Sequence, residues 1–364
     1  MNFRAGLISA LNNAGYDVVA LSPRDKYTEA VEALGCRFVE LPMNPTGTSV
    51  FSNLRLLLQF ILTLRRERPD FFLTFTIKPN ILGSMAARIL KIRYINNITG
   101  LGKVFAKRTL LMRLAIFLYS FALSKSSCVF FQNPDDCSLF AELGILKGQP
   151  TDVLPGSGVN LDHFKCRTPD TRNPANNTAG VTSFIFVSRM LRDKGVLEFC
   201  EAARILRGAG TATEFKLLGP VAEDPEWVPL AVIKEWHDKG VVSYLGEADD
   251  VRTFVLDSDC VVLPTFYREG VPRALIEAAA MARPLIATNV AGCREIVRDK
   301  ENGFLVAPLN TQDLADKMLK FAALAPDLKI KMGNRSREIA EGKFSEKVVI
   351  EKYTNCFRRK QSFN

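Results

Sequence analysis

Two glutamates eight positions apart, Glu269 and Glu277, lie in the stretch YREGVPRALIEAAAMARPLIA at 267–287. Pro272 suits the first position of a helix, where a missing N–H costs nothing, and Gly270 allows a ligand to approach the backbone. Glu277 then lies about 7 Å along the helix axis. Such separate carboxylates suit two hydroxyl groups of an elongated polyol better than one shared metal ion. In the structural alternative, Glu269 favours the helix N-terminus and Glu277 pairs with a nearby arginine.

Two cations precede a second predicted helix, in the stretch SRMLRDKGV at 188–196. Arg189 ends an apolar run that predicts a strand, and Lys194 comes directly before Gly195. Fixed positive charge and the backbone N–H groups of a helix N-terminus favour the same ligand, a diphosphate. The alternative is a strand-to-helix turn with surface charges, and these residues alone leave it open.

Two further stretches follow or precede strands of the same half. TNVAGCREIV, at 288–297, runs from a strand end through Gly292 into a helix, and this turn would face the same ligand. The aspartates of DSD, at 257–259, could bind a divalent metal, but they precede the strand CVVLP instead of following it. They therefore belong to the opposite edge of the sheet from the ligand, and we interpret them as structural.

Short apolar runs alternate with helical patterns and predict the elements that position these residues. In the second half, strands are predicted at 182–190, 214–220, 241–246, 260–264, 284–289 and 303–306, and a helix at 196–208. In the first half, strands are predicted at 16–23, 37–42, 71–76, 127–133 and 151–158, and helices at 54–68, 81–90 and 108–125. The alternation predicts an α/β protein of two doubly wound, Rossmann-like domains. Ligands in such sheets bind beyond the carboxyl ends of the strands, here in a cleft between the domains.

A polar stretch rich in Pro and Asn, at 166–180, predicts a linker. We therefore expect an N-terminal domain over 1–165 and a C-terminal domain over 166–344. A last helix, at about 345–364, is expected to pack back on the first domain.

The chain opens with a helical pattern, whereas a doubly wound domain opens with its central strand. Without that strand, its two neighbours would lie about 9–10 Å apart instead of about 4.8 Å. We therefore expect that the first strand of the N-terminal domain is missing here and that the natural chain begins upstream of Met1.

The composition is that of a soluble globular protein of 364 residues with a mean hydropathy near zero. No apolar run reaches the roughly 18 residues of a spanning helix, and no signal peptide pattern opens the chain. The eight cysteines form no CxxC motif, so we expect reduced thiols in the cytoplasm. Two histidines are too few for a histidine-rich metal site.

The net charge is +9, and the excess is concentrated in residues 51–125, which hold 13 Lys and Arg and only two acids. Such a region suits nucleic acid, an anionic membrane or a phosphorylated acceptor. The alternative is a solvated basic surface. No nucleic-acid motif accompanies the charge, and we expect no nucleic-acid partner.

Together these features resemble the retaining glycosyltransferases of family 4, which have the GT-B fold. Glu269 and Glu277 match the family's E-x7-E pair, and Arg189 and Lys194 match its cationic element. LPGSGVNLDHF, at 154–164, is similar to the segment that ends the first domain in the family. The resemblance covers nearly the whole chain.

The resemblance implies catalytic roles for Glu269, Arg189 and Lys194. The two cations would bind the diphosphate of a UDP-sugar and stabilise the charge that develops as it leaves. Glu269 would hold hydroxyl groups of the donor sugar. No metal ion and no other cofactor is expected, since the cations take that role.

The donor site implied by the resemblance includes four further residues. Glu277 would bind the ribose, and the backbone of Gly270 and Val271 would approach the sugar and the distal phosphate. Gly292 would complete the site from the next strand.

A narrower resemblance concerns TFTIKPNILGS, NNITGLGKVF and FFQNPDD, at 74–84, 96–105 and 130–136. These segments are similar to those of bacterial enzymes that extend polyprenyl-diphosphate-linked sugars, N-acetylgalactosaminyltransferases above all. The resemblance implies a role in surface polysaccharide, O-antigen or glycan assembly, and a peripheral place on the inner face of the cytoplasmic membrane. There the basic region would meet the anionic lipid.

The acceptor-side candidates are Lys78, Thr99, Gly100 and Gly102. For Lys78, the alternative is a surface lysine after a strand. Many relatives have a histidine near the donor sugar in this domain, and this chain has none before His163. Lys78 or backbone groups would have to take its place.

Two other functions remain open. A chain without its first strand could be a non-catalytic remnant that binds a nucleotide sugar or a membrane. A UDP-sugar epimerase of GT-B fold is the further alternative, but it would need several acid and base groups around the donor, and histidines are scarce.

Overall fold

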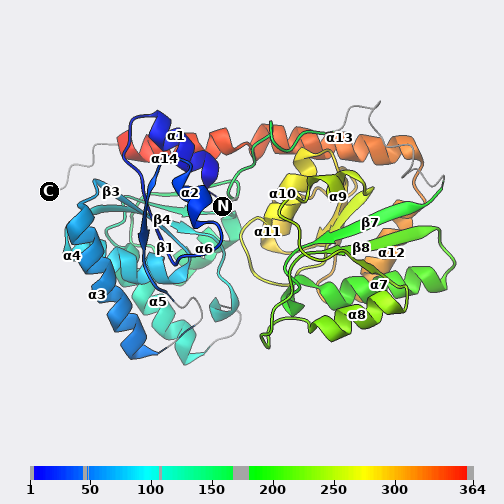
Figure 1. The fold of residues 1–364 in the computed structure, drawn as a ribbon, viewed down its shortest axis with the longest axis horizontal. Helices are drawn as coiled ribbons and strands as arrows, with labels where there is room; N and C mark the ends of the chain where they lie inside the picture. Colours follow the sequence, from blue (N-terminus) through cyan, green and yellow to red (C-terminus); the bar gives the residue numbers. More distant parts are fainter. Residues whose placement is uncertain (1–3, 44–46, 48, 106–108, 167–179, 359–364) are drawn as a thin grey trace. The chain divides into compact units, whose positions relative to one another are not determined.

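The computed structural model describes residues 4–43, 47, 49–105, 109–166 and 180–358 (Figure 1). The chain divides into two compact units, Met1–Gly158 with Glu346–Asn364, and Val159–Ser345. Each unit contains parallel β-sheet with helices packed on it, so the predicted fold of two Rossmann-like domains is confirmed. Most of the predicted linker, 167–179, lies outside the described residues.

The first unit contains two parallel sheets. β1 (Val19–Ser22) pairs with β2 (Arg37–Glu40). The other sheet has the order β3-β4-β5-β6, formed by Phe71–Phe75, Arg93–Ile98, Cys128–Phe131 and Thr151–Val153. In the described part of the unit, no ladder joins β1 to β3. The expected missing strand concerns residues outside this sequence and stays a prediction.

The strand β4 was not predicted from the sequence, because Asn96 and Asn97 interrupt its apolar pattern. Both asparagines are buried. Asn96 Nδ2 donates to Thr74 Oγ1 at 2.7 Å and to Ser84 Oγ at 2.6 Å. Hydrogen bonds from the amide nitrogens thus compensate part of the polar burial that made this segment look unlike a strand, while Oδ1 of each asparagine is buried without a partner among the described residues.

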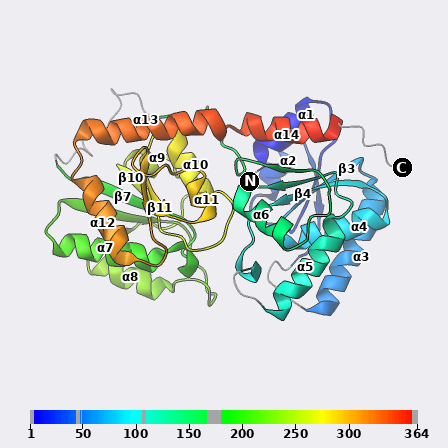
Figure 2. The same cartoon turned by 180° about the vertical axis from the view of Figure 1, so that it is seen from behind.

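Helices cover both faces of the four-stranded sheet (Figures 1 and 2). One face carries α3, the π-helical turn η1, α4, α5 and α6, formed by Val50–Glu67, Pro79–Gly83, Ser84–Ile89, Leu110–Leu123 and Pro134–Glu142. The other face carries α1 (Ala5–Asn13) and α14 (Glu346–Arg358). Two short helices, α2 (Thr28–Glu32) and η2 (Lys103–Phe105), complete the unit.

The helix α14 packs deep into the first unit although it lies at the far end of the sequence. Tyr353 is fully buried, against Phe130 of β5 and beside α1. Its hydroxyl accepts a hydrogen bond from Asn97 Nδ2 at 2.7 Å. α14 is therefore part of this unit's core.

The second unit has one six-stranded parallel sheet with the order β12-β11-β10-β7-β8-β9. In chain order, β7 to β12 are Thr182–Val187, Thr213–Leu218, Ser243–Tyr244, Cys260–Leu263, Leu285–Thr288 and Gly303–Val306. The helices are η5, α7, α8, α9, α10, α11, α12 and α13, at Arg192–Lys194, Val196–Gly208, Leu230–Asp238, Arg252–Leu256, Arg273–Ala280, Ala291–Arg294, Thr311–Ala322 and Pro326–Lys343. The predicted helix 196–208 and strand 303–306 have the observed bounds.

Among the helices of the described ranges, none combines the length and the apolar character that crossing a lipid bilayer requires.

Candidate active site

The candidate site of the second unit lies at the carboxyl ends of β7, β10 and β11, which are neighbours in the sheet. Parallel strands bring the loops that follow them to one edge. Glycine is required where the ends of the neighbouring strands β7 and β8 meet. Gly219 follows β8 with φ of +148°, and a Cβ there would lie 1.9 Å from the backbone oxygen of Ser188.

The turn after β7 docks on the loop after β10 through its backbone. The carbonyl oxygen of Asp193 accepts a hydrogen bond from Thr265 Oγ1 at 3.1 Å and two more from backbone N–H groups of that loop. Gly195 has φ of +81°, and a Cβ there would lie 2.2 Å from the backbone oxygen of Pro264, which directly follows β10. This close approach brings Lys194 to Glu269.

Lys194 and Glu269 form an ion pair with 2.5 Å between Nζ and Oε2. Their side chains are only 11% and 18% exposed, so both charges are largely removed from water. Lys194 Nζ also lies 5.6 Å from the ring centre of Tyr267. The structure therefore brings together Lys194 and Glu269, to which the family resemblance assigned the donor diphosphate and the donor sugar.

The second carboxylate oxygen of Glu269 is one of the buried polar atoms at this edge without a hydrogen-bond partner in the described part of the chain, and Thr288 Oγ1 at the end of β11 is another. Oε1 is buried and has no hydrogen-bond partner within the described residues. Leaving such an acceptor unsatisfied costs about 1–3 kcal/mol. A ligand hydroxyl that donates to Oε1 would remove this cost.

Glu277 lies on α10 and is only 7% exposed. Its Oε1 accepts a hydrogen bond from Arg273 Nε at 2.5 Å. This is the arginine pairing expected in the structural alternative for Glu277. Because Arg273 is four residues earlier, the carboxylate lies toward the helix start, at the strand-end edge. Burial raises the pKa of Glu277, and the neighbouring Arg273 opposes that shift.

The start of α10 differs from the prediction by one residue. Pro272 is the N-cap, with φ −62° and ψ 122°, and Arg273 is the first helical residue. Proline fixes φ but leaves ψ free, so the extended ψ ends the loop at this residue. Glu277 nevertheless lies inside the helix, as expected.

The backbone of the loop after β10 contacts the start of α11. Gly292 is buried there, and a Cβ on it would lie 1.5 Å from the carbonyl oxygen of Gly270. Val271 is also buried, at 7% exposure. The structure thus places Gly270, Val271 and Gly292 beside Glu269, whereas Arg189 lies exposed two residues beyond β7.

Arg273 and Tyr267 were not singled out from the sequence. For Arg273 a signal was available, because it lies four residues before Glu277 on the predicted helix. The predicted place of the DSD aspartates is confirmed, because Asp259 directly precedes β10. Its carboxylate accepts a hydrogen bond from the backbone N–H of Ser183 at 2.9 Å, at the amino edge of the sheet.

The acceptor-side candidates lie together at the carboxyl edge of the first unit's sheet. Lys78 lies between β3 and η1, and Thr99, Gly100 and Gly102 follow the neighbouring strand β4. Asn80 Nδ2 donates to the carbonyl oxygen of Asn97 at 2.8 Å and so ties the turn after β3 to β4.

Two features of these residues suit a ligand. Gly100 and Gly102 have φ of 131° and 59°, which glycine adopts without strain. Lys78 is half-buried, and burial lowers its pKa.

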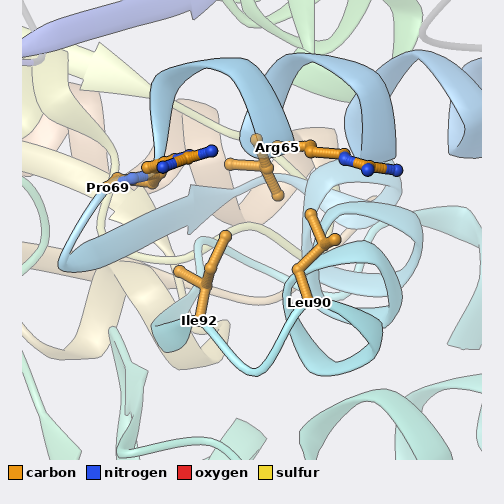
Figure 3. Close-up of a pocket in the computed structure, with 6 residues that line it drawn as sticks. Arg65, Pro69, Leu90 and Ile92 are labelled. Atoms are coloured by element: carbon orange, nitrogen blue, oxygen red, sulfur yellow. The ribbon is translucent and has the colours of Figure 1, made fainter.

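A shallow hollow in the first unit lies at the opposite edge of this sheet. Figure 3 shows Arg65 and Pro69 above Leu90 and Ile92; the complete lining is Leu64, Arg65, Arg68, Pro69, Leu90 and Ile92. Pro69 and Ile92 precede β3 and β4, so the hollow is separate from the acceptor-side candidates.

Family models match both halves of the chain. Residues 3–156 match the glycosyl transferase 4-like domain, and residues 182–323 match glycosyl transferases group 1. The chain belongs to the glycosyltransferases of GT-B fold, with a 4-like domain followed by a group 1 domain.

Two curated relatives are similar over most of their length. One is N,N'-diacetylbacillosaminyl-diphospho-undecaprenol alpha-1,3-N-acetylgalactosaminyltransferase of Campylobacter jejuni, 25% identical over 98% of this chain and 95% of the relative. The other is a capsular polysaccharide biosynthesis glycosyltransferase of Staphylococcus aureus, 23% identical over 85% of this chain and 82% of the relative.

Solved structures share the fold. A glycosyltransferase from Rickettsia africae superposes with a TM-score of 0.79 at 20% identity, covering 98% of this chain and 95% of the other. HepE from Anabaena, solved in complex with UDP, superposes with a TM-score of 0.78 at 17% identity and the same coverage.

Proposed function

We propose that the protein is a retaining glycosyltransferase that moves a sugar from a UDP-sugar to a polyprenyl-diphosphate-linked saccharide. The sugar is a hexose or an N-acetylhexosamine, with N-acetylgalactosamine as the first choice. The proposed process is the assembly of bacterial surface polysaccharide or glycan, on the cytoplasmic face of the membrane. The Campylobacter relative, whose name includes this sugar and an undecaprenol-linked acceptor, supports the choice.

The observation that carries the proposal is the buried Lys194–Glu269 pair with its unsatisfied oxygen. In the proposed mechanism, Glu269 Oε1 accepts a hydrogen bond from a donor-sugar hydroxyl. Lys194 lies beside it and faces the diphosphate, with exposed Arg189 as the second cation. Both stabilise negative charge that grows on the leaving diphosphate, so they act most strongly in the transition state.

Glu277 and the glycine turns hold the rest of the donor. Glu277 accepts hydrogen bonds from the ribose, and Arg273 holds its carboxylate in place. Gly270, Val271 and Gly292 bring backbone groups close to the sugar and the distal phosphate. We propose that the reaction needs no metal ion, because Lys194 and Arg189 supply the positive charge.

On the acceptor side we propose Lys78 for the lipid diphosphate, with the loop of Thr99, Gly100 and Gly102 beside the acceptor sugar. The basic region 51–125 suits the anionic lipid around such an acceptor.

The test is a transfer assay with a panel of UDP-sugars and a synthetic polyprenyl-diphosphate-linked N-acetylhexosamine. We expect one preferred UDP-sugar and a product with the anomeric configuration of the donor, read by NMR. Glu269→Gln should abolish transfer, whereas Glu235→Gln on α8, where the carboxylate is 62% exposed, should not. Full activity of Glu269→Gln would refute the assigned role. UDP binding by calorimetry with no turnover of any UDP-sugar would support the non-catalytic alternative.

A further inference from the structure

The helix α3 is apolar on the side that faces away from its own core. The buried stripe that packs on the sheet is formed by Leu56, Phe60 and Leu64. The opposite stripe is also apolar, and its exposed fractions are 87%, 54%, 52% and 66% for Phe51, Leu54, Leu58 and Leu62. A surface helix of a globular protein normally presents polar residues there.

The helix α5 repeats this pattern. Its buried stripe is formed by Met112, Ala115, Tyr119, Ala122 and Leu123. The exposed residues recur at helical spacing, with fractions of 80%, 53%, 67% and 44% for Leu110, Leu114, Phe117 and Phe121. Single exposed leucines are common on protein surfaces, but two helices with apolar outer sides expose far more apolar surface than that.

The two helices belong to one layer of the first unit. Both pack on the segment formed by η1 and α4, and α3 and α5 appear in the same corner of the unit in both views (Figures 1 and 2). Each helix follows a strand and begins at the carboxyl edge of a sheet. The exposure is greatest at these beginnings, at Phe51 and Leu110. Lys78 and Thr99 lie at the same edge.

The charge on this layer has one sign. Two exposed cations lie within the helices beside the apolar stripes, Arg55 on α3 and Arg113 on α5, and four more lie near the amino edge of the sheet: Arg65, Arg66, Lys91 and Lys125. The helices α4 and α5 contain no acid, and the single acid of α3, Glu67, is paired with Arg37 and Arg66. A second copy of this chain would bring like charges together across the contact, which disfavours a symmetric dimer through this face.

We propose that the exposed faces of α3 and α5 insert into the surface of an anionic lipid bilayer. Phe and Leu side chains enter the boundary between head groups and acyl chains, and Arg55 and Arg113 beside them bind anionic head groups. This inference rests on the proposed function and deepens it, since it names the surface that holds the enzyme where a lipid-linked acceptor lies. The carboxyl edge of the sheet then faces the head groups, with Lys78 at the level of the lipid diphosphate.

The test is co-sedimentation of the full chain with vesicles, either of phosphatidylcholine alone or with about a third phosphatidylglycerol. Wild type should bind the anionic vesicles and lose most of the binding at about 1 M salt, where the Debye length is near 3 Å. Phe51→Ser with Leu54→Ser, and Leu110→Ser with Phe117→Ser, should each lower the partition coefficient tenfold or more, because each removes two large apolar side chains.

A matched control comes from the second unit. Leu328 and Ile330 on α13 are each 48% exposed, and their double change to Ser should leave vesicle binding unchanged. Equal binding by all variants would overturn the proposal, as would an equal loss in this control. A wild-type dimer in analytical ultracentrifugation that Phe51→Ser with Leu54→Ser dissociates would also overturn it, because the face would then bind a second copy.

A second readout separates this proposal from the proposed function. Transfer to a short-chain, water-soluble acceptor should be unchanged in the α3 and α5 variants, whereas transfer to a long-chain acceptor in vesicles should fall with the partition coefficient. Vesicle binding without transfer from any UDP-sugar would leave the docking surface standing and refute the proposed function. Transfer that stays unchanged in vesicles for the non-binding variants would refute the docking role alone.

Discussion

The Lys194–Glu269 pair allows a quantitative test of the candidate site. Lys194→Met removes the cation and leaves Glu269, 18% exposed, with one oxygen unpaired and the other already without a partner. Breaking a buried pair in this way costs roughly 3–5 kcal/mol. Because both side chains retain some contact with water, we expect the lower end, about 3 kcal/mol. Glu269→Gln should cost a similar amount, since it leaves the ammonium group buried.

The double variant tests the coupling between the two charges. With both charges removed, no buried ion remains, so the double variant should cost less than the sum of the singles by about 1–3 kcal/mol. The free energy of unfolding can be followed by urea denaturation with tryptophan fluorescence. The only tryptophans, Trp227 and Trp236, lie in the second unit and pack against its core, so the signal reports that unit.

The helix α8 provides a control ion pair whose N–O distance is nearly the same as that of Lys194 and Glu269. Lys239 and Glu235 are 2.6 Å apart, but their side chains are 63% and 62% exposed. Their coupling should be only about 0.3–0.5 kcal/mol. Additive effects within about 0.5 kcal/mol for Lys194 and Glu269 would refute the coupling. Transfer by Lys194→Met should fall on the order of 10²–10³-fold, as for loss of one transition-state donor.

Three further changes have defined outcomes. Gly292→Ala places a Cβ 1.5 Å from a backbone oxygen, so it should lower the free energy of unfolding in urea by about 3 kcal/mol or more and abolish UDP binding. Its control is Gly342→Ala on α13, where a Cβ would meet open space, and this change should be neutral or stabilising. Tyr353→Phe leaves the buried Asn97 amide without its acceptor and should cost about 1–3 kcal/mol, measured by thermal unfolding. Burial raises the pKa of Glu277 above its ordinary 4.5, so its contribution to stability is greatest below pH 4.5 and is lost as the pH rises through the folded pKa. Wild type should therefore lose stability relative to Glu277→Gln between pH 4 and 7; a constant difference would contradict the raised pKa.

The sequence predicted the second unit more completely than the first. Its central strands β7, β10 and β11 are buried on both faces and appear as nearly continuous apolar runs, and Gly195 marks the start of α7. In the first unit, β4 was missed because the amide nitrogens of Asn96 and Asn97 donate to side chains far away in the sequence. Local pattern contains no information on such partners.

The same limit applies to the candidate site. Residue types and strand ends predicted which side chains would lie at one edge of the sheet. They did not predict the contact of Lys194 with Glu269, because backbone hydrogen bonds to Asp193 create it and any residue type can make those. The arginine partner of Glu277 follows from helical spacing, and it was expected only in the structural alternative. The roles assigned to these residues stay predictions until transfer is measured.

The place of α14 has a consequence for synthesis on the ribosome. The first unit is closed by Glu346–Arg358, yet about 190 residues separate Gly158 from Glu346. At about 5–20 residues per second, translation of that interval takes roughly 10–40 s. Throughout this time the surface that receives Tyr353, including Leu7, Leu11 and Phe130, stays uncovered. The residues of the second unit are all synthesised before the last helix of the first, so a nascent chain of this protein exposes that apolar surface while the second unit is being made.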